Sequence, residues 1–466
     1  MSDPVKDLAS ITTDGWLVGG AVRDRLIGRP TTDYDVAVGQ DPRELSRVLA
    51  RATDGHAFRL SEEFGSWRVV ARDHSWQLDL LPLAGESIEA DLARRDFTIN
   101  AIAEPLAGGE PVDPFDGVDD LRAGRLRMVS ARALAEDPLR TLRLARLACE
   151  LAFSVEDNTL AAAREHASGL QVVAGERVFA ELRRIVTADR ALEGLELMDA
   201  IGATGVVLPE LTELRGVEQS SYHHLDVLDH TRQVLAETIA LEREPERWLG
   251  EHADAVRNVL AEPLANELTR GGALRFGALL HDVAKPQTRR VTPEGRVTFI
   301  GHDVTGAAVA VSVLSRLRAS ERLTEHVAAL ARHHLRLGFL VREMPLDRRA
   351  IYRYLRACEP VEVDVTLLSV ADRLATRGRG SQEAIGRHLE LARQLLGEAL
   401  RWRAERPRPP VGGNVLRHEL GLPPGPELGR ILTELEEASF VGEVTSSEEA
   451  IARARELLAQ KASADQ

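Results

Sequence analysis

The chain of 466 residues contains little cysteine, little lysine and few aromatic side chains. Its two cysteines, Cys149 and Cys358, cannot form a disulfide framework or a four-thiolate zinc site, and their apolar surroundings predict buried free thiols. Aromatic residues make up 4% of the sequence, which argues against nucleic-acid recognition mainly by base stacking. Lys6, Lys285 and Lys461 are the only lysines, so arginine supplies nearly all the positive charge.

The sequence also has no long hydrophobic run. No stretch approaches the roughly 20 apolar residues that a membrane-spanning helix needs, and residues 1–14 have no apolar signal core. We therefore expect a soluble, cytoplasmic protein with no membrane partner. A net charge of −14 excludes a surface that is basic throughout, but a local basic groove depends only on where the arginines lie.

Periodicity divides the chain into a mixed part and a helical part. Residues 16–18 and 34–38 predict buried strands, and residues 67–81 predict a hairpin. From about 132 to 375 the pattern is helical, with one predicted hairpin at 289–299. A proline-rich stretch near residue 406 then leads into a last helical segment. The usual domain size of about 150 residues suggests roughly three domains.

The amino-terminal part carries a pattern suited to phosphoryl transfer. Gly19 and Gly20 stand between a predicted strand and a predicted helix, where glycine lets backbone N–H groups approach a phosphate. Asp33 and Asp35 are two residues apart on a strand, so both carboxylates point to one face. Two adjacent carboxylates repel unless a cation lies between them, which predicts a Mg²⁺ site. Asp79, in the predicted strand at 76–81, is our candidate for a third catalytic carboxylate.

Asp137 and Arg140 are predicted to select the incoming base. Three residues apart on a predicted helix, they would share one face. The aspartate can accept from an exocyclic amino group while the arginine donates to a ring nitrogen. Cytosine and adenine offer that pair of groups, and uracil and guanine do not. Such a protein pair can select CTP and ATP without a nucleic-acid template.

Five segments in this order resemble the motifs of the class II tRNA nucleotidyltransferase and bacterial poly(A) polymerase family. They are Gly19–Asp35, Arg94–Ala101, Asp113–Gly117, Glu136–Arg143 and Glu176–Arg184. The resemblance implies a nucleotidyltransferase that extends the tRNA 3′ end, with the acceptor stem, CTP and ATP as partners. The nucleotide-binding residues it implies are Gly19, Gly20, Arg23, Arg95, Asp96, Asn100, Glu136, Asp137, Arg140, Arg143 and Arg184.

One segment departs from the family pattern. Members that add the whole CCA end usually carry a loop of about ten or more residues before the second motif, whereas here Leu83–Ser87 runs directly into residues 88–94. In the family, a missing loop accompanies enzymes that add only the two cytidines, so AMP addition stays open. A poly(A) polymerase remains an alternative enzyme. A catalytically inactive head that serves as an RNA-binding platform for a hydrolase remains an alternative of another class.

Histidines and aspartates in the second half form a candidate metal site. Imidazole and carboxylate ligands together suit Mn, Fe, Ni, Co or Zn. The order of these residues resembles the HD phosphohydrolase superfamily, in its variant with enough ligands for two metals. The resemblance implies phosphatase and 2′,3′-cyclic phosphodiesterase activity. The candidate ligands are His230, His281, Asp282, His302, His333, His334 and Asp372. Either His333 or His334 would be the direct ligand, and His223 and His224 are more typical of capping or supporting groups.

These resemblances imply an α+β protein with a small mixed-sheet nucleotidyltransferase head, an all-α neck and body, and an all-α HD domain. The predicted domains are the head at 1–125, the neck and body at 126–215, the HD domain at 216–400 and a helical tail at 401–466. Arginine-rich helices at 122–146 and 177–190 are predicted to contact the acceptor stem. The sequence leaves the oligomeric state open.

Overall fold

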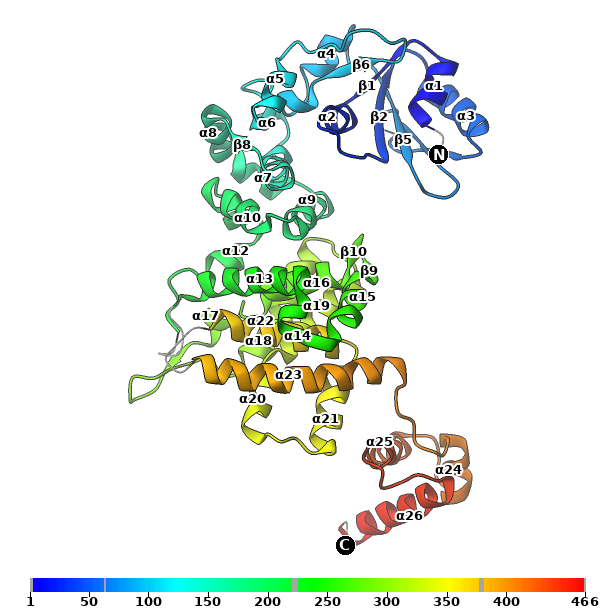
Figure 1. Cartoon of the computed structure of the whole chain (residues 1–466), viewed down its shortest axis with the longest axis vertical. Helices are drawn as coiled ribbons and strands as arrows, with labels where there is room; N and C mark the ends of the chain where they lie inside the picture. Colours follow the sequence, from blue (N-terminus) through cyan, green and yellow to red (C-terminus); the bar gives the residue numbers. More distant parts are fainter. Residues whose placement is uncertain (1–2, 63, 220–224, 377–380, 465–466) are drawn as a thin grey trace. The chain divides into compact units, whose positions relative to one another are not determined.

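The computed structural model describes residues 3–62, 64–219, 225–376 and 381–464. The chain forms two compact units, Met1–Pro209 and Glu210–Gln466, which are treated separately below. The predicted fold class is confirmed, because a small mixed sheet is followed by helical domains (Figure 1). The finer division into four domains stays a prediction. Among the described residues, no helix combines the length and apolar character needed to cross a bilayer.

The first unit begins with a six-stranded sheet in the order β3-β4-β5-β2-β1-β6. Its strands are β1 (Gly15–Val18), β2 (Asp33–Val38), β3 (His56–Arg59), β4 (Trp67–Val70), β5 (Gln77–Pro82) and β6 (Ala103–Pro105). All neighbouring strands are antiparallel except β2 and β5, which are parallel. The predicted strands at 16–18 and 34–38 and the hairpin of β4 and β5 are confirmed.

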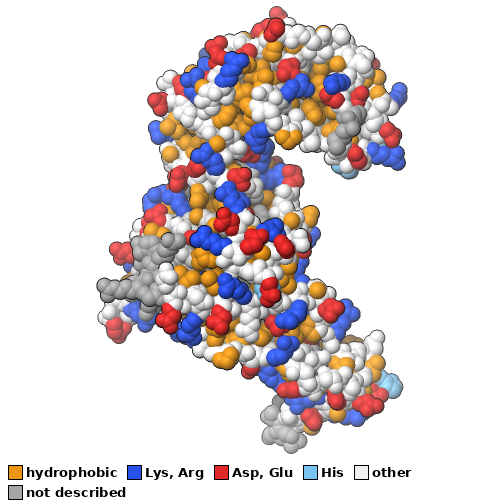
Figure 2. Space-filling model, in the orientation of Figure 1, with side chains coloured by type: hydrophobic (Ala, Val, Ile, Leu, Met, Phe, Trp, Pro, Cys, Tyr) orange, Lys and Arg blue, Asp and Glu red, His pale blue; other side chains and the backbone are white. Residues whose placement is uncertain are grey.

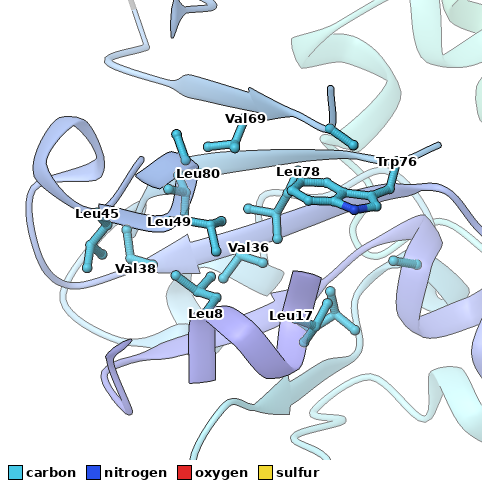
Figure 3. Packing of buried hydrophobic residues seen from close by; sticks show 14 of the residues in the cluster. Leu8, Leu17, Val36, Val38, Leu45, Leu49, Val69, Trp76, Leu78 and Leu80 are labelled. Atoms are coloured by element: carbon cyan, nitrogen blue, oxygen red, sulfur yellow. The ribbon is translucent and has the colours of Figure 1, made fainter. Parts of the chain in front are cut away.

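Alternation along the strands separates a fully apolar face from a face that carries acids. On the apolar face, Val36 and Val38 of β2 pack with Leu78 and Leu80 of β5 (Figure 3). Two helices, α1 (Pro4–Ile11) and α3 (Pro42–Ala52), cover this face. Since side chains alternate, Asp33 and Asp35 point to the other face together with Ala37, and Asp79 lies on that face as well.

The acidic face is bordered by short elements that hold the second and third motifs. Ala37 packs there with Ile88 and Leu92 of a short helix and with Ala101. Helical elements of the first unit besides α1 and α3 are α2 (Gly20–Leu26), α4 (Ile88–Leu92), η1 (Thr98–Asn100), α5 (Gly117–Arg122), α6 (Ala133–Glu136), α7 (Leu139–Leu151), α8 (Asp157–His166), η2 (Ala167–Val172), α9 (Gly175–Thr187), α10 (Ala191–Ala200), α11 (Ala203–Val207) and α12 (Pro209–Thr212), which ends just beyond the unit. Two-residue strands β7 (Arg125–Leu126) and β8 (Ser154–Val155) pair where the neck begins.

The second unit is a helical bundle followed by three further helices. Its helices are α13 (Val227–Arg243), α14 (Pro245–Leu249), η3 (Gly250–His252), α15 (Ala253–Ala261), α16 (Arg270–Leu280), α17 (Lys285–Thr288), α18 (His302–Arg316), α19 (Glu321–His333), α20 (Arg336–Leu340), η4 (Val341–Glu343), α21 (Arg348–Cys358), α22 (Glu362–Ala375), α23 (Ser381–Ala404), α24 (Gly413–Leu420), α25 (Pro426–Val441) and α26 (Ser447–Ala464). The last three share an apolar core of their own, including Leu416, Ile431 and Leu435.

The helical part contains more strand than the sequence predicted. The hairpin at 289–299 is confirmed, as β11 (Arg290–Val291) pairs with β12 (Val297–Thr298). However, it is not the one exception to the helical pattern, because β9 (Pro263–Ala265) and β10 (Leu268–Thr269) form another hairpin. Its turn, at Asn266 and Glu267, has positive φ angles of 54° and 59°. Its two strands are too short to show a clear alternation of apolar and polar residues in the sequence.

The described surface mixes charges of both signs. Figure 2 shows acidic and basic side chains interspersed over the visible face. Both cysteines are buried and free, as the sequence predicted.

Two adjacent residues of α3 test the assigned core of the head. Leu49 is fully buried, whereas its neighbour Val48 is 44% exposed. Leu49→Ala should lower the free energy of unfolding of the head by about 2–5 kcal/mol, because it removes buried apolar contacts and leaves a cavity. Val48→Ala should change it by less than about 0.5 kcal/mol. Hydrogen exchange of the β2 and β5 amides measures this local stability, and equal effects of the two substitutions would contradict the core assignment.

Candidate active site and metal centre

A cavity of about 380 Å³ opens within the first unit, on the acidic face of the sheet. It gathers residues from β2, the turn before α2, the second motif and helices α7 and α9. The lining residues are Gly19, Gly20, Ala21, Arg23, Asp24, Thr31, Asp33, Asp35, Arg94, Arg95, Asp96, Asn100, Asp137, Arg140, Arg143, Arg146 and Arg184. Acids at one side and many arginines around them suit a polyanion that is bound together with a cation.

Asp33 and Asp35 form the acidic side of this cavity. Both side chains lie on the acidic face of β2, and Gln77 donates a hydrogen bond to Asp33 at 3.0 Å. Burial and the neighbouring charge of Asp33 raise the pKa of Asp35 to about 6, although Arg95 acts in the opposite direction. The cluster therefore holds more negative charge than its surroundings favour, and a divalent cation would relieve that repulsion. The oxygen donors present fit Mg²⁺.

Gly19 leaves the space in which Arg95 approaches Asp35. Its φ angle is 73°, and a Cβ at this position would lie 2.9 Å from Arg95 Nη1 and 3.5 Å from Asp35 Oδ2. Only glycine combines this backbone with this close approach. Arg95 is also held by Asp91, one turn earlier, at 3.0 Å.

A chain of polar contacts joins three of the motifs. Buried Arg23 donates to Asn100 Oδ1 at 2.8 Å, and Asn100 donates to Asp96 Oδ1 at 2.9 Å. The other Asp96 oxygen pairs with Arg143 of α7 at 2.9 Å. Burial alone would raise the pKa of Asp96, but the charge of Arg143 and the bond from Asn100 lower it, so Asp96 is anionic at neutral pH. These contacts fix the neck helix α7 against the head.

Asp79 lies beside the acidic pair but is already bound by an arginine. It is the register partner of Asp35 across the parallel β2–β5 pair, and of Arg68 across β4 and β5. Arg68 donates to both Asp79 oxygens, at 2.6 and 2.7 Å. The structure therefore brings Asp79 to the site as a neutralised neighbour, and it does not line the cavity.

The helical spacing predicted for the base-selecting pair is wrong. Asp137 has an extended backbone between α6 and α7, and its carboxylate accepts from Leu139 N and from Arg177. Arg140, in the first turn of α7, donates to the carbonyls of Arg94 at 2.7 Å and of Ala133 at 2.9 Å. Both residues line the cavity, but in this conformation the Arg140 guanidinium ties the second motif to the neck.

The remaining predicted residues divide between the cavity and the surface. Arg184 lines the cavity and pairs with Glu150 at 2.8 Å, whereas Glu136 is exposed on α6 and outside the lining. The sequence analysis missed Arg146, which is buried and bound to Glu150 and Glu181. Arg140, Arg143 and Arg146 recur every three residues on one helix face, a spacing that could have identified Arg146.

The second unit brings six of the seven predicted metal ligands together. Asp282 follows α16, and its two oxygens face four imidazoles. Its Oδ2 lies 3.1 Å from His281 Nε2 and 3.6 Å from His230 Nε2, and its Oδ1 lies 3.3 Å from His302 Nε2 and 3.7 Å from His334 Nε2. Asp372 of α22 pairs with His230 at 3.1 Å. Two groups of potential metal ligands share the Asp282 carboxylate: His230, His281 and Asp282, and Asp282, His302 and His334. This donor set is suited to one metal ion in each group.

Backbone carbonyls orient three of these imidazoles. Nδ1 of His281, His302 and His334 lies 2.9, 2.6 and 2.7 Å from the carbonyl oxygens of Ala278, Phe299 and Ala331. A proton on each Nδ1 completes these hydrogen bonds, so Nε2, which lies toward Asp282, is the atom that would bind a metal ion. Such outer contacts are typical of metal-binding histidines.

Burial and charge shift the pKa values of these groups. Burial opposes the positive charge of His281, but the neighbouring Asp282 raises the pKa of its ring. Burial, with the nearby charge of His281, lowers the pKa of His334 to about 4, so its ring is neutral at pH 7. Burial opposes ionisation of Asp282, but the positive charges of His281 and Lys285 hold its pKa well below the usual value. A neutral imidazole beside an ionised carboxylate is the donor set expected for a transition metal.

His333 is the one predicted ligand outside this cluster. It accepts a hydrogen bond from Arg336 at 2.8 Å through Nδ1, and burial together with Arg336 lowers its pKa to about 4. The geometry therefore favours His334 as the potential ligand of the pair. His223 and His224 lie outside the described residues.

A cavity of about 720 Å³ adjoins the second cluster. Asp282, His302, His334 and Asp372 line it, together with Lys285 and Arg373. The sequence analysis did not identify these two cations as site residues. Lys285 lies three residues after Asp282 and pairs with it at 2.7 Å. This spacing in the sequence could have identified Lys285 as a residue of the site.

Family models match three parts of the chain. The poly A polymerase head domain matches residues 15–83 and 77–127, and the probable RNA and SrmB-binding site of polymerase A matches residues 152–214. The HD domain matches residues 227–377.

Two curated relatives and one solved structure extend these matches over nearly the whole length. The chain is 38% identical to the A-adding tRNA nucleotidyltransferase of Deinococcus radiodurans, over 93% of each protein. It is 37% identical to the CC-adding tRNA nucleotidyltransferase of Thermus thermophilus, over 94% of this chain and 92% of that one. A CCA-adding enzyme solved in complex with CTP shares the fold, with a TM-score of 0.62 and 19% identity over 97% of this chain and 94% of that one.

The raised pKa of Asp35 predicts pH-dependent cation binding at the acidic pair. Because the folded pKa lies above the usual carboxyl value, the proton is favoured below about pH 6 and competes there with a cation. Mg²⁺ affinity should therefore weaken about tenfold per pH unit below 6 and level off above it. The measurement is the rise in melting temperature caused by Mg²⁺ at pH 5 and pH 7.5. A rise that is equal at both pH values, or that Asp35→Asn retains, would contradict this assignment.

Adjacent histidines provide a matched test of the second cluster. His334→Ala should lower Mn²⁺ or Ni²⁺ affinity about tenfold or more, because it removes an Nε2 donor that faces Asp282. His333→Ala should leave the affinity unchanged, since His333 faces Arg336 instead. The metal content of each purified protein after dialysis is the measurement. Loss of metal from the His333 variant alone would reverse our choice of ligand.

Proposed function

Since the chain belongs to the family of tRNA nucleotidyltransferases and poly(A) polymerases, we propose that it transfers CMP from CTP to the 3′ end of tRNA without a nucleic-acid template. The observation that carries this proposal is the cavity in which Asp33 and Asp35 face a ring of arginines. The relatives from Deinococcus and Thermus are both named as tRNA nucleotidyltransferases.

Each side of the cavity has a distinct task in this reaction. The RNA 3′-hydroxyl oxygen bonds to the α-phosphorus of CTP, the bond to the β-phosphate oxygen breaks, and pyrophosphate and the hydroxyl proton leave. Asp33 and Asp35 are the residues that would hold Mg²⁺, which offsets the phosphate charge and favours loss of that proton. Arg95 and Arg143 lie where a triphosphate would need counter-charges. Asp79 lies next to the pair, but Arg68 binds both of its oxygens and offsets its charge.

The residues proposed to select the base lie at the start of α7. Asp137 and Arg140 both line the cavity, and we assign them the recognition of the amino group and ring nitrogen of cytosine. Arg140 uses three of its five N–H donors on the carbonyls of Arg94, Arg95 and Ala133, which leaves two donors for a base. Glu136 would act only from the edge of this site.

The short connection after β5 favours a stop after two cytidines. Only Leu83–Ser87 separates β5 from α4, so there is no long loop at this position. The second candidate is addition of the terminal A, which the similarly close A-adding relative supports.

For the second unit we propose a phosphohydrolase that prepares the same RNA end. Water would open a 2′,3′-cyclic phosphate by breaking one P–O bond, and a second water would release inorganic phosphate and leave the free 3′ hydroxyl. His230, His281, Asp282, His302, His334 and Asp372 would hold one or two transition-metal ions such as Mn, Ni, Fe or Co, which supply activation of water. The matching HD model supports the assignment.

The two activities should be separable by single substitutions. On tRNAs that end before the CCA, after one C and after two, the protein with Mg²⁺ and each nucleotide singly should add CMP up to the second C. Asp35→Asn should reduce the rate of CMP addition at least about 100-fold, because it removes one of the two carboxylates that would hold Mg²⁺ beside the reacting phosphates. The same substitution should leave the phosphohydrolase activity unchanged. Asp282→Asn should do the reverse. Asp54→Asn, an exposed acid of the head, is the matched control.

Product length decides among the alternatives. One A added to a tRNA that ends in CC would identify an A-adding enzyme. Long A tails would identify a poly(A) polymerase. No incorporation, with hydrolysis intact, would leave only the hydrolase.

A further inference from the structure

The cavity beside the second cluster has an apolar wall that metal binding does not explain. Phe339 is 66% exposed and Ile300 is 88% exposed, and both line the cavity. Phe299, Leu335 and Val341 extend the wall. Exposed apolar side chains that gather beside a polar centre are typical of a binding surface.

The wall is built on the same segments as the metal ligands. Ile300 lies two residues before His302, and the carbonyl of Phe299 holds His302 Nδ1 at 2.6 Å. Phe339 lies on α20, which begins two residues after His334. Short connections on both sides therefore keep the apolar wall next to the cluster.

Basic side chains also line this cavity. Lys285, Arg296, Arg342 and Arg373 all border it. Arg373 Nε is buried and has no hydrogen-bond partner among the residues that the structure describes. A phosphate ester would supply acceptors for these donors.

We propose that this cavity binds the unstacked terminal nucleoside of an RNA 3′ end, with its phosphate at the cluster and its base against Phe339 and Ile300. The inference rests on the proposed phosphohydrolase function and adds which part of the substrate is recognised. A bare phosphate ester has no apolar face to cover this wall, and a paired end keeps its base stacked. Because every base offers a flat apolar face, the wall selects single-stranded ends without choosing among bases.

The test compares substrates that do and do not carry a base. With Mn²⁺, Phe339→Ala in the full-length protein should lower kcat/KM for adenosine 3′-phosphate and 2′,3′-cyclic AMP about tenfold, mainly through KM. Hydrolysis of glycerol 2-phosphate, which has no base, should be unchanged. Phe339→Tyr should retain wild-type values. Phe64→Ala is the matched control, since Phe64 of the head is also 66% exposed.

A binding measurement separates this inference from the hydrolase proposal. Calorimetry of the wild type and Phe339→Ala with adenosine 3′-phosphate requires no turnover. Binding that depends on Phe339 without hydrolysis would overturn the phosphohydrolase and keep the nucleoside site. Hydrolysis or binding that Phe339→Ala leaves unchanged, or an equal loss on glycerol 2-phosphate, would overturn the nucleoside site. So would a change in oligomeric state, which would identify the wall as a protein contact.

Discussion

Repulsion between two carboxylates on one strand is the constraint from which the first site is built. Strand alternation directs Asp33 and Asp35 to the same face, and burial limits the screening of Asp35 by water. The arrangement is unfavourable by itself, as the raised pKa of Asp35 shows. In the function that we propose, a divalent cation would neutralise the acids and the arginines of the cavity would neutralise the phosphates. On this proposal, the repulsion links metal binding to nucleotide binding.

The second site solves a similar problem with different ligands. There, Asp282 stands between four imidazoles, and backbone carbonyls fix three of the rings. Nitrogen donors and a shared carboxylate suit transition metals, whereas the oxygen donors of the head suit magnesium. The two centres can therefore hold different ions in one chain, in keeping with a hydrolase that prepares an RNA end and a transferase that extends it.

Local patterns in the sequence predicted much of this, and contacts over long sequence distances account for what it missed. The spacing of Asp33 and Asp35 is enough to place both carboxylates, because alternation is a local property. Periodicity assigned Asp137 to a helix, yet its carboxylate accepts from Leu139 N and from Arg177, forty residues away. Likewise, sequence order could not distinguish His333 from His334, since adjacent residues at a helix end differ only in what packs against them. The pairing of Arg68 with Asp79 was missed although both lie in the predicted hairpin, because the hairpin prediction did not fix which residues lie opposite one another.

The most direct test of the central claim is anomalous diffraction from crystals that contain Mn²⁺ in place of Mg²⁺, together with CTP. The account predicts a peak within bonding distance of carboxylate oxygens of both Asp33 and Asp35, beside the triphosphate. A bound nucleotide with no peak at these two residues would contradict it.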